Sequence, residues 1–391
     1  MYYRNNHRSN QFQRGQFPRN VRRVKVYDPS DLINGNARET AVEAPYQAAN
    51  SFSDFVLNEI LKKNILDVGY SVPTAIQDKV IPLILGDKDV IGISNTGTGK
   101  TAAFLIPLIN KVAADRKRKV LIITPTRELA VQIRNEFYAL ARGLGIYSAA
   151  LIGGMNINGQ KAELNRRPHF VIGTPGRLKD MIRQNSLRLS EFGIIVLDET
   201  DQMVDIGFIN DIKYFISLLA PVRQSLFFSA TVSGKVSQII SSFVRNPITV
   251  SVKKHDLLKN ITHEVIRVSD KLRKIEHLQN LLTKKEFEKV LIFGRTKWGM
   301  QKLSIELMKR GFKAAAIHGN KSQSQRLRIL DQFRRDEINV LLATDIASRG
   351  LDISGVTHVI NFDPPESYEA YIHRIGRTGR AEKPGTALTF I

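Results

Sequence analysis

Residues 94–101 combine glycine, hydroxyl and lysine side chains in the spacing of a phosphate-binding loop. The run follows a short apolar stretch, opens an amphipathic one, and consists of Ser94, Asn95, Thr96, Gly97, Thr98, Gly99, Lys100 and Thr101. Such glycines let backbone N–H groups face phosphates, the lysine reaches the outer phosphates, and the final hydroxyl can bind Mg²⁺. The generic pattern has glycine in place of Ser94, and a turn without a ligand is the alternative. Gly-Lys-Thr between a strand and a helix nevertheless favours nucleotide binding.

Two adjacent carboxylates, Asp198 and Glu199, follow the apolar run 194–197. At a strand end, one acid can hold Mg²⁺ opposite a phosphate loop, and a second can orient the attacking water. Taken alone, the pair could equally cap a helix. Together with the loop, it predicts hydrolysis of a nucleoside triphosphate. Lys100, Asp198 and Glu199 would be catalytic, and Thr101 and Asp198 would hold Mg²⁺, partly through water.

The elements that must position these groups alternate along the chain. From Phe52 onward, short apolar runs are followed by longer amphipathic stretches, which is typical of βα units around a parallel sheet. Ligands of open α/β sheets bind at the carboxyl ends of the strands, so the polar residues there are site candidates. The expected strands are 90–94, 120–124, 170–174, 194–198 and 226–229, then 290–293, 314–318, 340–343, 358–362 and 387–391.

Two series of such units predict an α/β chain with two similar-sized domains. Residues 251–260 have little apolar periodicity and are expected to link the two series. The expected divisions are a basic, disordered N-terminal extension at 1–49, a first domain at 50–250, a linker at 251–261 and a second domain at 262–391.

The charge balance points to a polyanionic partner. The chain has 58 Lys and Arg against 37 Asp and Glu, a formal net charge of +21, which favours attraction to nucleic acid. The first 27 residues carry no acid, and their arginines alternate with Tyr2, Tyr3, Phe12 and Phe17. Such an arm could stack on unpaired bases, or it could be a solubilising tail without specific contacts.

Several classes of protein are disfavoured by composition. The sequence has no cysteine, which excludes disulfides and thiolate metal sites. No apolar run approaches the roughly 20 residues of a membrane span. The basic N-terminal segment is not followed by the apolar stretch of a secretory signal. We therefore expect no membrane association and a cytoplasmic location.

Together these motifs, in this order, resemble the DEAD-box RNA helicases of helicase superfamily 2, in their compact bacterial type. The resemblance covers about residues 50–391. It implies two tandem RecA-like domains, ATP and Mg²⁺ as ligands, and local, non-processive unwinding of short RNA duplexes or remodelling of ribonucleoproteins. RNA would be bound largely independently of sequence. A monomer is expected, and partners in ribonucleoprotein or ribosome assembly are conceivable.

The resemblance assigns the remaining ATP contacts. Gln77 would hydrogen-bond the adenine edge, Tyr70 would stack on the ring, and Phe52 would pack behind them. In the second domain, Gly350 and Asp352 would contact ATP, the latter at the ribose. Arg377 and Arg380 would be catalytic arginine fingers, and such fingers contribute roughly 10³ to 10⁵ in rate in related reactions.

It also assigns coupling and RNA contacts. Ser229, Thr231 and His373 would couple ATP turnover to strand separation. Short motifs like these, read individually, are more typical of turns, caps and surface patches. The residues implied to bind RNA are Pro125, Thr126, Arg127, Gly153, Gly154, Thr174, Pro175, Gly176 and Arg177, then Gly319, Gln323, Arg326 and Thr344.

One residue departs from the family pattern. The second motif has alanine where this chain has Thr200, so it reads Asp-Glu-Thr-Asp. A β-branched hydroxyl there could alter packing against Ser229 and Thr231, and with it the coupling of hydrolysis to unwinding. The alternative function is therefore an ATP-gated RNA clamp or annealing chaperone with little unwinding. A DNA helicase and a protein-directed ATPase are further alternatives that the motifs disfavour.

Overall fold

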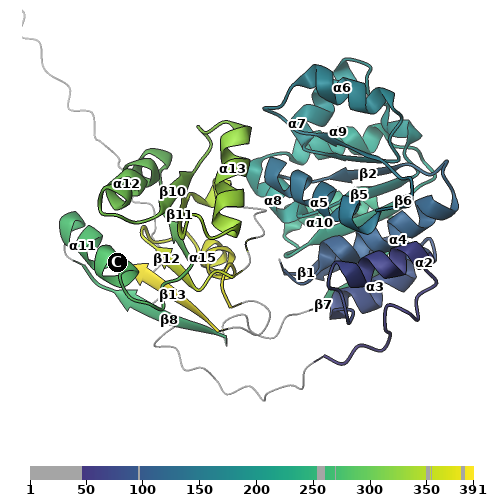
Figure 1. Cartoon of the computed structure of the whole chain (residues 1–391). Helices are drawn as coiled ribbons and strands as arrows, with labels where there is room; N and C mark the ends of the chain where they lie inside the picture. The colour runs from purple at the N-terminus through teal and green to yellow at the C-terminus, as the bar shows by residue number, and fades with distance from the viewer. Residues whose placement is uncertain are drawn as a thin grey trace, which may run out of the picture.

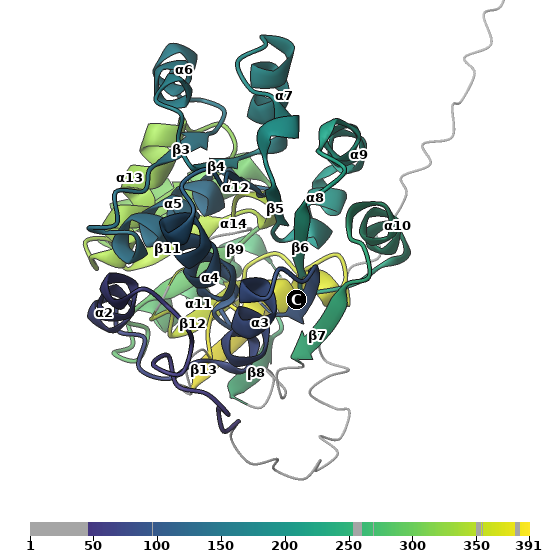
Figure 2. The same cartoon turned by 90° about the vertical axis from the view of Figure 1, so that its right-hand side faces the viewer.

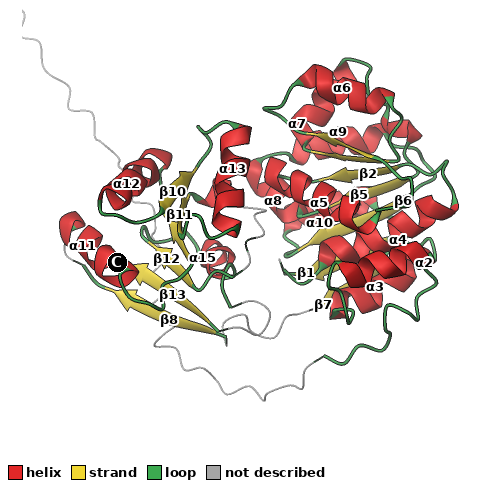
Figure 3. Ribbon diagram, in the orientation of Figure 1, coloured by secondary structure: helices red, strands yellow, loops and turns green. Residues whose placement is uncertain are grey.

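The computed structural model describes residues 46–95, 97–252, 260–268, 270–348, 353, 355–379 and 384–391. Within this part of the chain, two parallel β-sheets lie side by side, each covered by helices (Figure 1, Figure 3). No helix in these residues has the length and apolar content needed to span a bilayer.

The first sheet has the strand order β3-β4-β2-β5-β6-β1-β7, and all its described pairs are parallel. Its central strands are buried on both faces, as expected for βα units. The strands are β1 (Val90–Ser94), β2 (Val120–Ile123), β3 (Ser148–Leu151), β4 (Phe170–Gly173), β5 (Ile194–Leu197), β6 (Gln224–Ser229) and β7 (Ile248–Val252).

Helices cover both faces of this sheet (Figure 2). One apolar core packs against α2 (Glu59–Asp67), α3 (Ala75–Leu85), α4 (Lys100–Ala114) and α5 (Arg127–Leu140). The opposite core includes side chains of α7 (Pro175–Arg183), α8 (Thr200–Ile206), α9 (Ile209–Leu218) and α10 (Gly234–Phe243). Helix α6 (Ile157–Asn165) and the 3₁₀ turn η1 (Leu189–Glu191) complete this half.

The second sheet repeats the arrangement with the order β10-β11-β9-β12-β13-β8. Its strands are β8 (Ile261–Ile266), β9 (Val290–Phe293), β10 (Ala314–Ile317), β11 (Val340–Ala343), β12 (His358–Asn361) and β13 (Gly385–Phe390). Its helices are α11 (Lys271–Leu282), α12 (Lys297–Lys309), α13 (Gln323–Arg334), α14 (Asp345–Ser348) and α15 (Tyr368–Ile375). Helices α11 and α12 pack on one face, and α13 packs on the other.

The expected fold of two parallel-sheet α/β domains is confirmed, and each strand predicted from an apolar run is present. Three further strands were not predicted. β3 is a Ser-Ala-Ala-Leu segment without a β-branched run. β7 and β8 lie at sheet edges and each has one buried residue, so polar side chains interrupt their apolar pattern.

The linker expected at 251–261 is shortened by strands at both ends. Ser251 and Val252 belong to β7, where they pair with Ile93 and Ser94 of β1. Ile261 begins β8 and pairs with Gly385. Backbone pairing to a neighbouring strand gives these residues a structure that their own side chains do not indicate. Residues 253–259 lie outside the described part of the chain, as does most of the extension at 1–49.

The two sheets bring the candidate residues to their carboxyl edges. In the first domain, β1 leads into the phosphate loop, β5 into Asp198, and β4 into Thr174. In the second, β10 leads to Gly319 and β11 to Thr344. Since neighbouring parallel strands end at the same edge, the polar residues that follow them are gathered there.

A close contact between strands β1 and β6 of the first sheet allows a stability test. Gly92 of β1 lies beside Phe228 of β6, and a Cβ added at Gly92 would stand 2.5 Å from two ring carbons. We expect Gly92→Ala to lower the free energy of unfolding by about 1–3 kcal/mol because the core cannot absorb the clash. The measurement is urea unfolding followed by circular dichroism.

The matched control is Gly159→Ala in α6, where nothing lies within 4 Å of the added Cβ. This variant should unfold at the same or a slightly higher urea concentration. Equal unfolding curves for the two variants would contradict the packing described for β1.

Candidate functional site

The phosphate loop is held in shape by its own side chains. Gly97 and Gly99 have φ values of 79° and 91°, which favour glycine. Lys100 Nζ donates to Ser94 O at 2.7 Å, and the Thr98 hydroxyl donates to Asn95 O at 2.9 Å. Lys100 is therefore already buried within the loop. A phosphate oxygen could replace Ser94 O as the acceptor of its hydrogen bond. Thr101 follows it in the first turn of α4.

Gln77 contacts the phosphate loop directly. Its Nε2 donates to Gly99 O at 3.2 Å, and its Oε1 accepts the Thr74 N–H at 2.9 Å. The Thr74 hydroxyl donates to Thr98 O at 2.8 Å. A primary amide retains one further N–H and one further lone pair, which are the groups that an adenine edge needs.

The two aromatic residues predicted for adenine lie together. The rings of Phe52 and Tyr70 have centroids 6.4 Å apart, and Phe52 is buried while Tyr70 is half-buried. The Tyr70 hydroxyl donates to Glu136 at 2.8 Å. Phe52 thus backs Tyr70, whose ring is the more accessible of the two.

Sequence reasoning missed Asp78, the residue after Gln77. Its buried carboxylate accepts hydrogen bonds from the Tyr46 hydroxyl at 2.6 Å, from the Ala49 N–H at 2.8 Å, and from the Asn50 backbone and side chain. Burial raises the pKa of the Tyr46 hydroxyl to about 12, together with its hydrogen bond to Asp78. Burial also acts to raise the pKa of Asp78, but the hydrogen bonds that it accepts outweigh this effect and lower its pKa. Asp78 therefore fixes the segment that leads to Phe52.

The paired acids lie at a strained turn between β5 and α8. Asp198 and Glu199 are both buried, and Glu199 has a φ of 49°. A left-handed non-glycine residue costs free energy and is typical of functional sites. Burial raises the pKa of both carboxyls, and Asp198 raises that of Glu199 further. The positive charge of Lys100 lowers both pKa values and that of Arg377 lowers the pKa of Glu199.

Asp201 connects the acidic motif to the predicted coupling motif. Its Oδ2 accepts hydrogen bonds from Ala230 N, Thr231 N and the Thr231 hydroxyl at 3.0–3.2 Å. Its own N–H donates to the Ser229 hydroxyl at 3.3 Å, which in turn donates to Thr231 O. A movement of α8 would therefore be transmitted to Ser229 and Thr231.

Most residues predicted to bind RNA in the first domain surround one cavity. This cavity of about 310 Å³ is lined by Pro125, Arg127, Gly153, Thr174, Gly176, Arg177, Asp180 and Phe208. Arg127 lies against the backbone of Gly153 and Gly154, where an added Cβ would clash with its guanidinium. Thr126 and Thr174 occupy the N-cap positions of α5 and α7.

The predicted RNA-binding residues Gln323 and Arg326 of α13 meet the first domain at Glu128. Gln323 Nε2 donates to Glu128 Oε1 at 2.9 Å, and Arg326 Nε lies 2.9 Å from the same oxygen. Both Gln323 and Glu128 are buried. Glu128 belongs to the same motif as Arg127 but was given no role of its own from the sequence, because its partner Gln323 lies 195 residues away in the chain.

The segment 373–377, which contains His373 and Arg377, is held in place by Arg374, an arginine that was not predicted as a site residue. Arg374 is buried, and it binds both carboxylate oxygens of Asp345 at 2.6 and 2.8 Å and the Asp363 carbonyl at 2.7 Å. His373 and Arg377, on either side of it, line an interdomain cavity of about 140 Å³ with Asp201 and Thr231. The cavity is therefore lined by predicted coupling residues of both domains, Thr231 of the first and His373 of the second.

The structure does not place every predicted residue. Thr96, Gly350, Asp352 and Arg380 lie outside the described residues. Gly319 is exposed and Thr344 is half-buried at the carboxyl edge of the second sheet.

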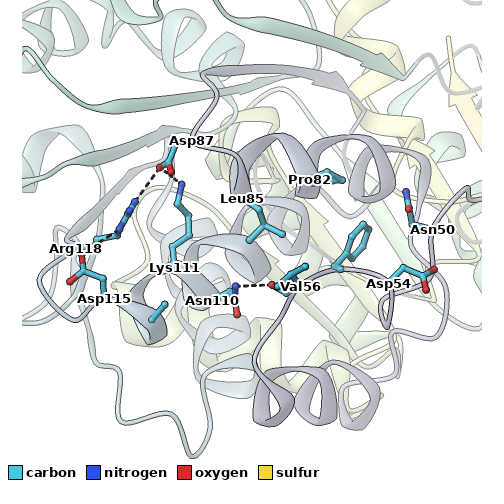
Figure 4. A pocket seen from close by; sticks show the side chains of 12 residues that line it. Asn50, Asp54, Val56, Pro82, Leu85, Asp87, Asn110, Lys111, Asp115 and Arg118 are labelled. Atoms are coloured by element: carbon cyan, nitrogen blue, oxygen red, sulfur yellow. Dashed lines mark hydrogen bonds and ion pairs between the residues drawn. The ribbon is translucent and has the colours of Figure 1, made fainter.

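A further cavity of about 560 Å³ lies between α3, α4 and the segment before α2 (Figure 4). None of the predicted site residues lines it. Its charged groups are paired with each other, since Lys111 and Arg118 both contact Asp87. Lys111 also donates to Ile84 O at 2.8 Å. The cavity is thus separate from the candidate site.

Comparison with known sequences agrees with this geometry. The DEAD/DEAH box helicase family profile matches residues 74–239, and the helicase conserved C-terminal domain profile matches residues 273–382. The DEAD-box ATP-dependent RNA helicase CshA of Bacillus licheniformis is 43% identical over 343 residues, which cover 87% of this chain and 70% of that protein.

Solved structures with the same fold are also similar to the chain. S. cerevisiae Dbp5 bound to RNA and ADP BeF3 is 30% identical, with a TM-score of 0.77 over 88% of this chain and 90% of that chain. A DEAD box protein from Methanococcus jannaschii is 36% identical, with a TM-score of 0.51 over 87% of this chain and 93% of that chain. The chain belongs to the DEAD-box family of ATP-dependent RNA helicases.

Proposed function

We propose that this chain is an RNA-dependent ATPase that uses ATP binding and hydrolysis to open short RNA duplexes or to remodel ribonucleoproteins. The main support for the proposal is the interdomain cavity that Arg377 and His373 of the second domain line together with Asp201 and Thr231 of the first. The positive charge of Arg377 also lowers the pKa of Glu199, which burial raises. An arginine of one domain beside a buried acid of the other completes a hydrolytic site only when the domains are together.

ATP is held mainly by the first domain in this proposal. Gln77 reads the adenine edge, Tyr70 stacks on the ring, and residues 94–101 surround the phosphates. Gln77 also contacts Gly99 O, so occupancy of the adenine site is transmitted to the loop. Gly350 and Asp352 of the second domain contact the nucleotide from the other side.

The buried acids fit a magnesium ion. Asp198 and Glu199 lie buried next to each other, and Glu199 Oε2 has no hydrogen-bond partner in the described residues. No group of three metal-ligating acids, histidines or cysteines converges in that part of the chain. This suits Mg²⁺, which keeps several waters and takes few protein ligands. Asp198 and Thr101 would hold it, and the ion would neutralise charge on the phosphates.

Glu199 orients the attacking water in the proposed reaction, and Lys100 with Arg377 and Arg380 stabilises the charge of the transferred phosphoryl group. Closure brings Arg377 to this position. Ser229 and Thr231 respond to closure through their hydrogen bonds with Asp201, and His373 lines the interdomain cavity together with Asp201 and Thr231. RNA binding and ATP binding are therefore linked, and each tightens the other.

RNA is bound through its backbone. The first-domain residues from Pro125 to Arg177 named above, and Gly319, Gln323, Arg326 and Thr344 of the second domain, present N–H groups, hydroxyls and charges. Such groups bind phosphates and 2′-hydroxyls without reading bases. Family membership favours unwinding over the ATP-gated clamp. The two are distinguished by whether duplex release scales with ATP turnover.

The proposal includes a monomeric, cytoplasmic protein with partners in ribonucleoprotein or ribosome assembly. It divides the chain into the extension 1–49, the domains 50–250 and 262–391, and the linker 251–261, whose first and last residues pair with β1 and β13. Size-exclusion chromatography with light scattering tests the monomer, because a dimer would elute at twice the mass.

The first prediction concerns ATP turnover. Steady-state ATPase activity should rise many-fold with single-stranded RNA and little with single-stranded DNA, because contacts to 2′-hydroxyls distinguish the two. Glu199→Gln should abolish the stimulated activity. If the protein still binds ATP but hydrolyses it at the same rate with and without RNA, the helicase proposal is refuted.

The second prediction concerns Thr200. Its side chain is fully buried and its hydroxyl has no partner in the described residues. An unpaired buried polar group costs about 1–3 kcal/mol. We therefore expect Thr200→Val, which keeps the volume, to raise the free energy of unfolding by about 1 kcal/mol or more. The measurement is urea unfolding.

Thr200→Ala is the matched variant. It also removes the hydroxyl but loses a buried methyl group worth about 0.8 kcal/mol, so it should be less stable than the valine variant. It restores the family's motif, and we expect it to release more duplex per ATP. Destabilisation by both substitutions would mean that the hydroxyl makes a favourable contact.

The third prediction concerns the interdomain contact. Glu128→Gln removes the charge opposite Arg326 but keeps an acceptor for Gln323. We expect the RNA concentration for half-maximal ATPase to rise about tenfold, since loss of one partner leaves a buried charge unpaired. Glu59→Gln on exposed α2 is the control. A lower RNA requirement would instead mean that Glu128 holds these side chains away from RNA.

A further inference from the structure

Trp298 is the only tryptophan of the chain, and it is 65% exposed. It lies in the first turn of α12, directly after the carboxyl end of β9. Thr296 caps this helix by accepting the Gly299 N–H at 3.0 Å, and the buried Met300, Leu303 and Leu307 anchor it in the core. A large ring is thus held on a rigid element and faces solvent.

The position of Trp298 is next to the predicted RNA contacts of the second domain. β9 and β10 flank β11 in the sheet, so the residues after these three strands share one edge. Gly319 follows β10 and Thr344 follows β11. Lys297 Nζ donates to Asn320 Oδ1 at 2.9 Å, which joins the turn before Trp298 to the Gly319 loop.

That edge continues into the first domain. Gln323 contacts Glu128, and a Cβ added at Gly154 would lie 3.4 Å from Gln323 Cβ. Arg127 in turn lies against Gly154 and lines the cavity of the first domain. The candidate RNA contacts therefore form one track across both domains, and Trp298 stands beyond its outer end.

The charge around Trp298 fits a polyanion. Residues 294–305 include Arg295, Lys297 and Lys302 and no acid, and all three basic residues are exposed. The carboxylate of Asp363 accepts the Arg295 backbone N–H at 2.8 Å, which fixes the turn. A lone exposed aromatic is ordinary on protein surfaces, but an aromatic among arginine and lysine at a phosphate-binding edge is typical of single-strand binding.

We propose that Trp298 stacks on an unpaired base of the bound RNA strand, beyond the backbone contacts, and so extends the single-strand site. The inference rests on the proposed RNA-binding function and adds a base contact to it. Stacking tolerates every base because each has a π face, so Trp298 increases affinity without creating sequence specificity. It would also hold a strand after local opening.

Since the chain has one tryptophan, its fluorescence reports this contact directly. Unlabelled oligouridine is titrated into the full chain with a non-hydrolysable ATP analogue, and tryptophan emission is followed. Binding of fluorescein-labelled oligouridine is measured in parallel by anisotropy. We expect RNA to quench the emission, Trp298→Ala to weaken binding about tenfold, and Trp298→Phe to retain most of the affinity. Circular dichroism verifies that each variant is folded.

The matched control is Ile305→Ala, two turns further along α12 and 41% exposed. Its RNA affinity should equal that of the unchanged protein. If anisotropy shows RNA binding while emission stays constant and Trp298→Ala binds normally, the stacking contact is refuted but the proposed function stands. Such a result would favour a protein partner at this face. If no RNA binds under any condition, the proposed function itself is refuted.

Discussion

The arrangement of the two domains depends on one buried carboxylate. Glu128 accepts a hydrogen bond from Gln323 and pairs with Arg326, both at 2.9 Å. A carboxylate in a dry interface is stable only with partners, and removing one leaves an uncompensated charge. Glu128 lies in the first turn of α5, directly after the predicted RNA-binding residues Pro125, Thr126 and Arg127. The same helix start can therefore contact RNA and the second domain, which relates RNA binding to domain closure.

Domain closure matters because Asp198 and Glu199, the acids proposed to act in hydrolysis, are held in place at a cost in free energy. Glu199 has a left-handed backbone, and burial raises the pKa of Glu199 and Asp198. Lys100 and Arg377 offset part of that cost, and the second of these comes from the other domain. Asp201 connects the same turn to Ser229 and Thr231. Binding energy from two ligands can thus assemble a site that one domain alone leaves incomplete.

The central strands were predictable because buried parallel strands are continuous apolar runs, and each run predicted as a strand forms one. The edge strands β3, β7 and β8 were not predicted. β3 is a Ser-Ala-Ala-Leu segment without a β-branched run, and pairing to β1 and β13 rather than side-chain pattern gives β7 and β8 their structure. The loops at strand ends were predictable from residue type and order. No role could be assigned to Asp78, Glu128 or Arg374 from the sequence, because their partners Tyr46, Gln323 and Asp345 are distant along the chain.

ATP and RNA together should bring the two domains into contact through Glu128. The chain has no cysteine, so one cysteine introduced at an exposed position of each domain allows specific labelling with two dyes. Single-molecule energy transfer would then report the interdomain distance. The account predicts that a short-distance state dominates only with an ATP analogue and RNA both present, and that Glu128→Gln depopulates it. A distance distribution unchanged by either ligand or by this substitution would contradict the account.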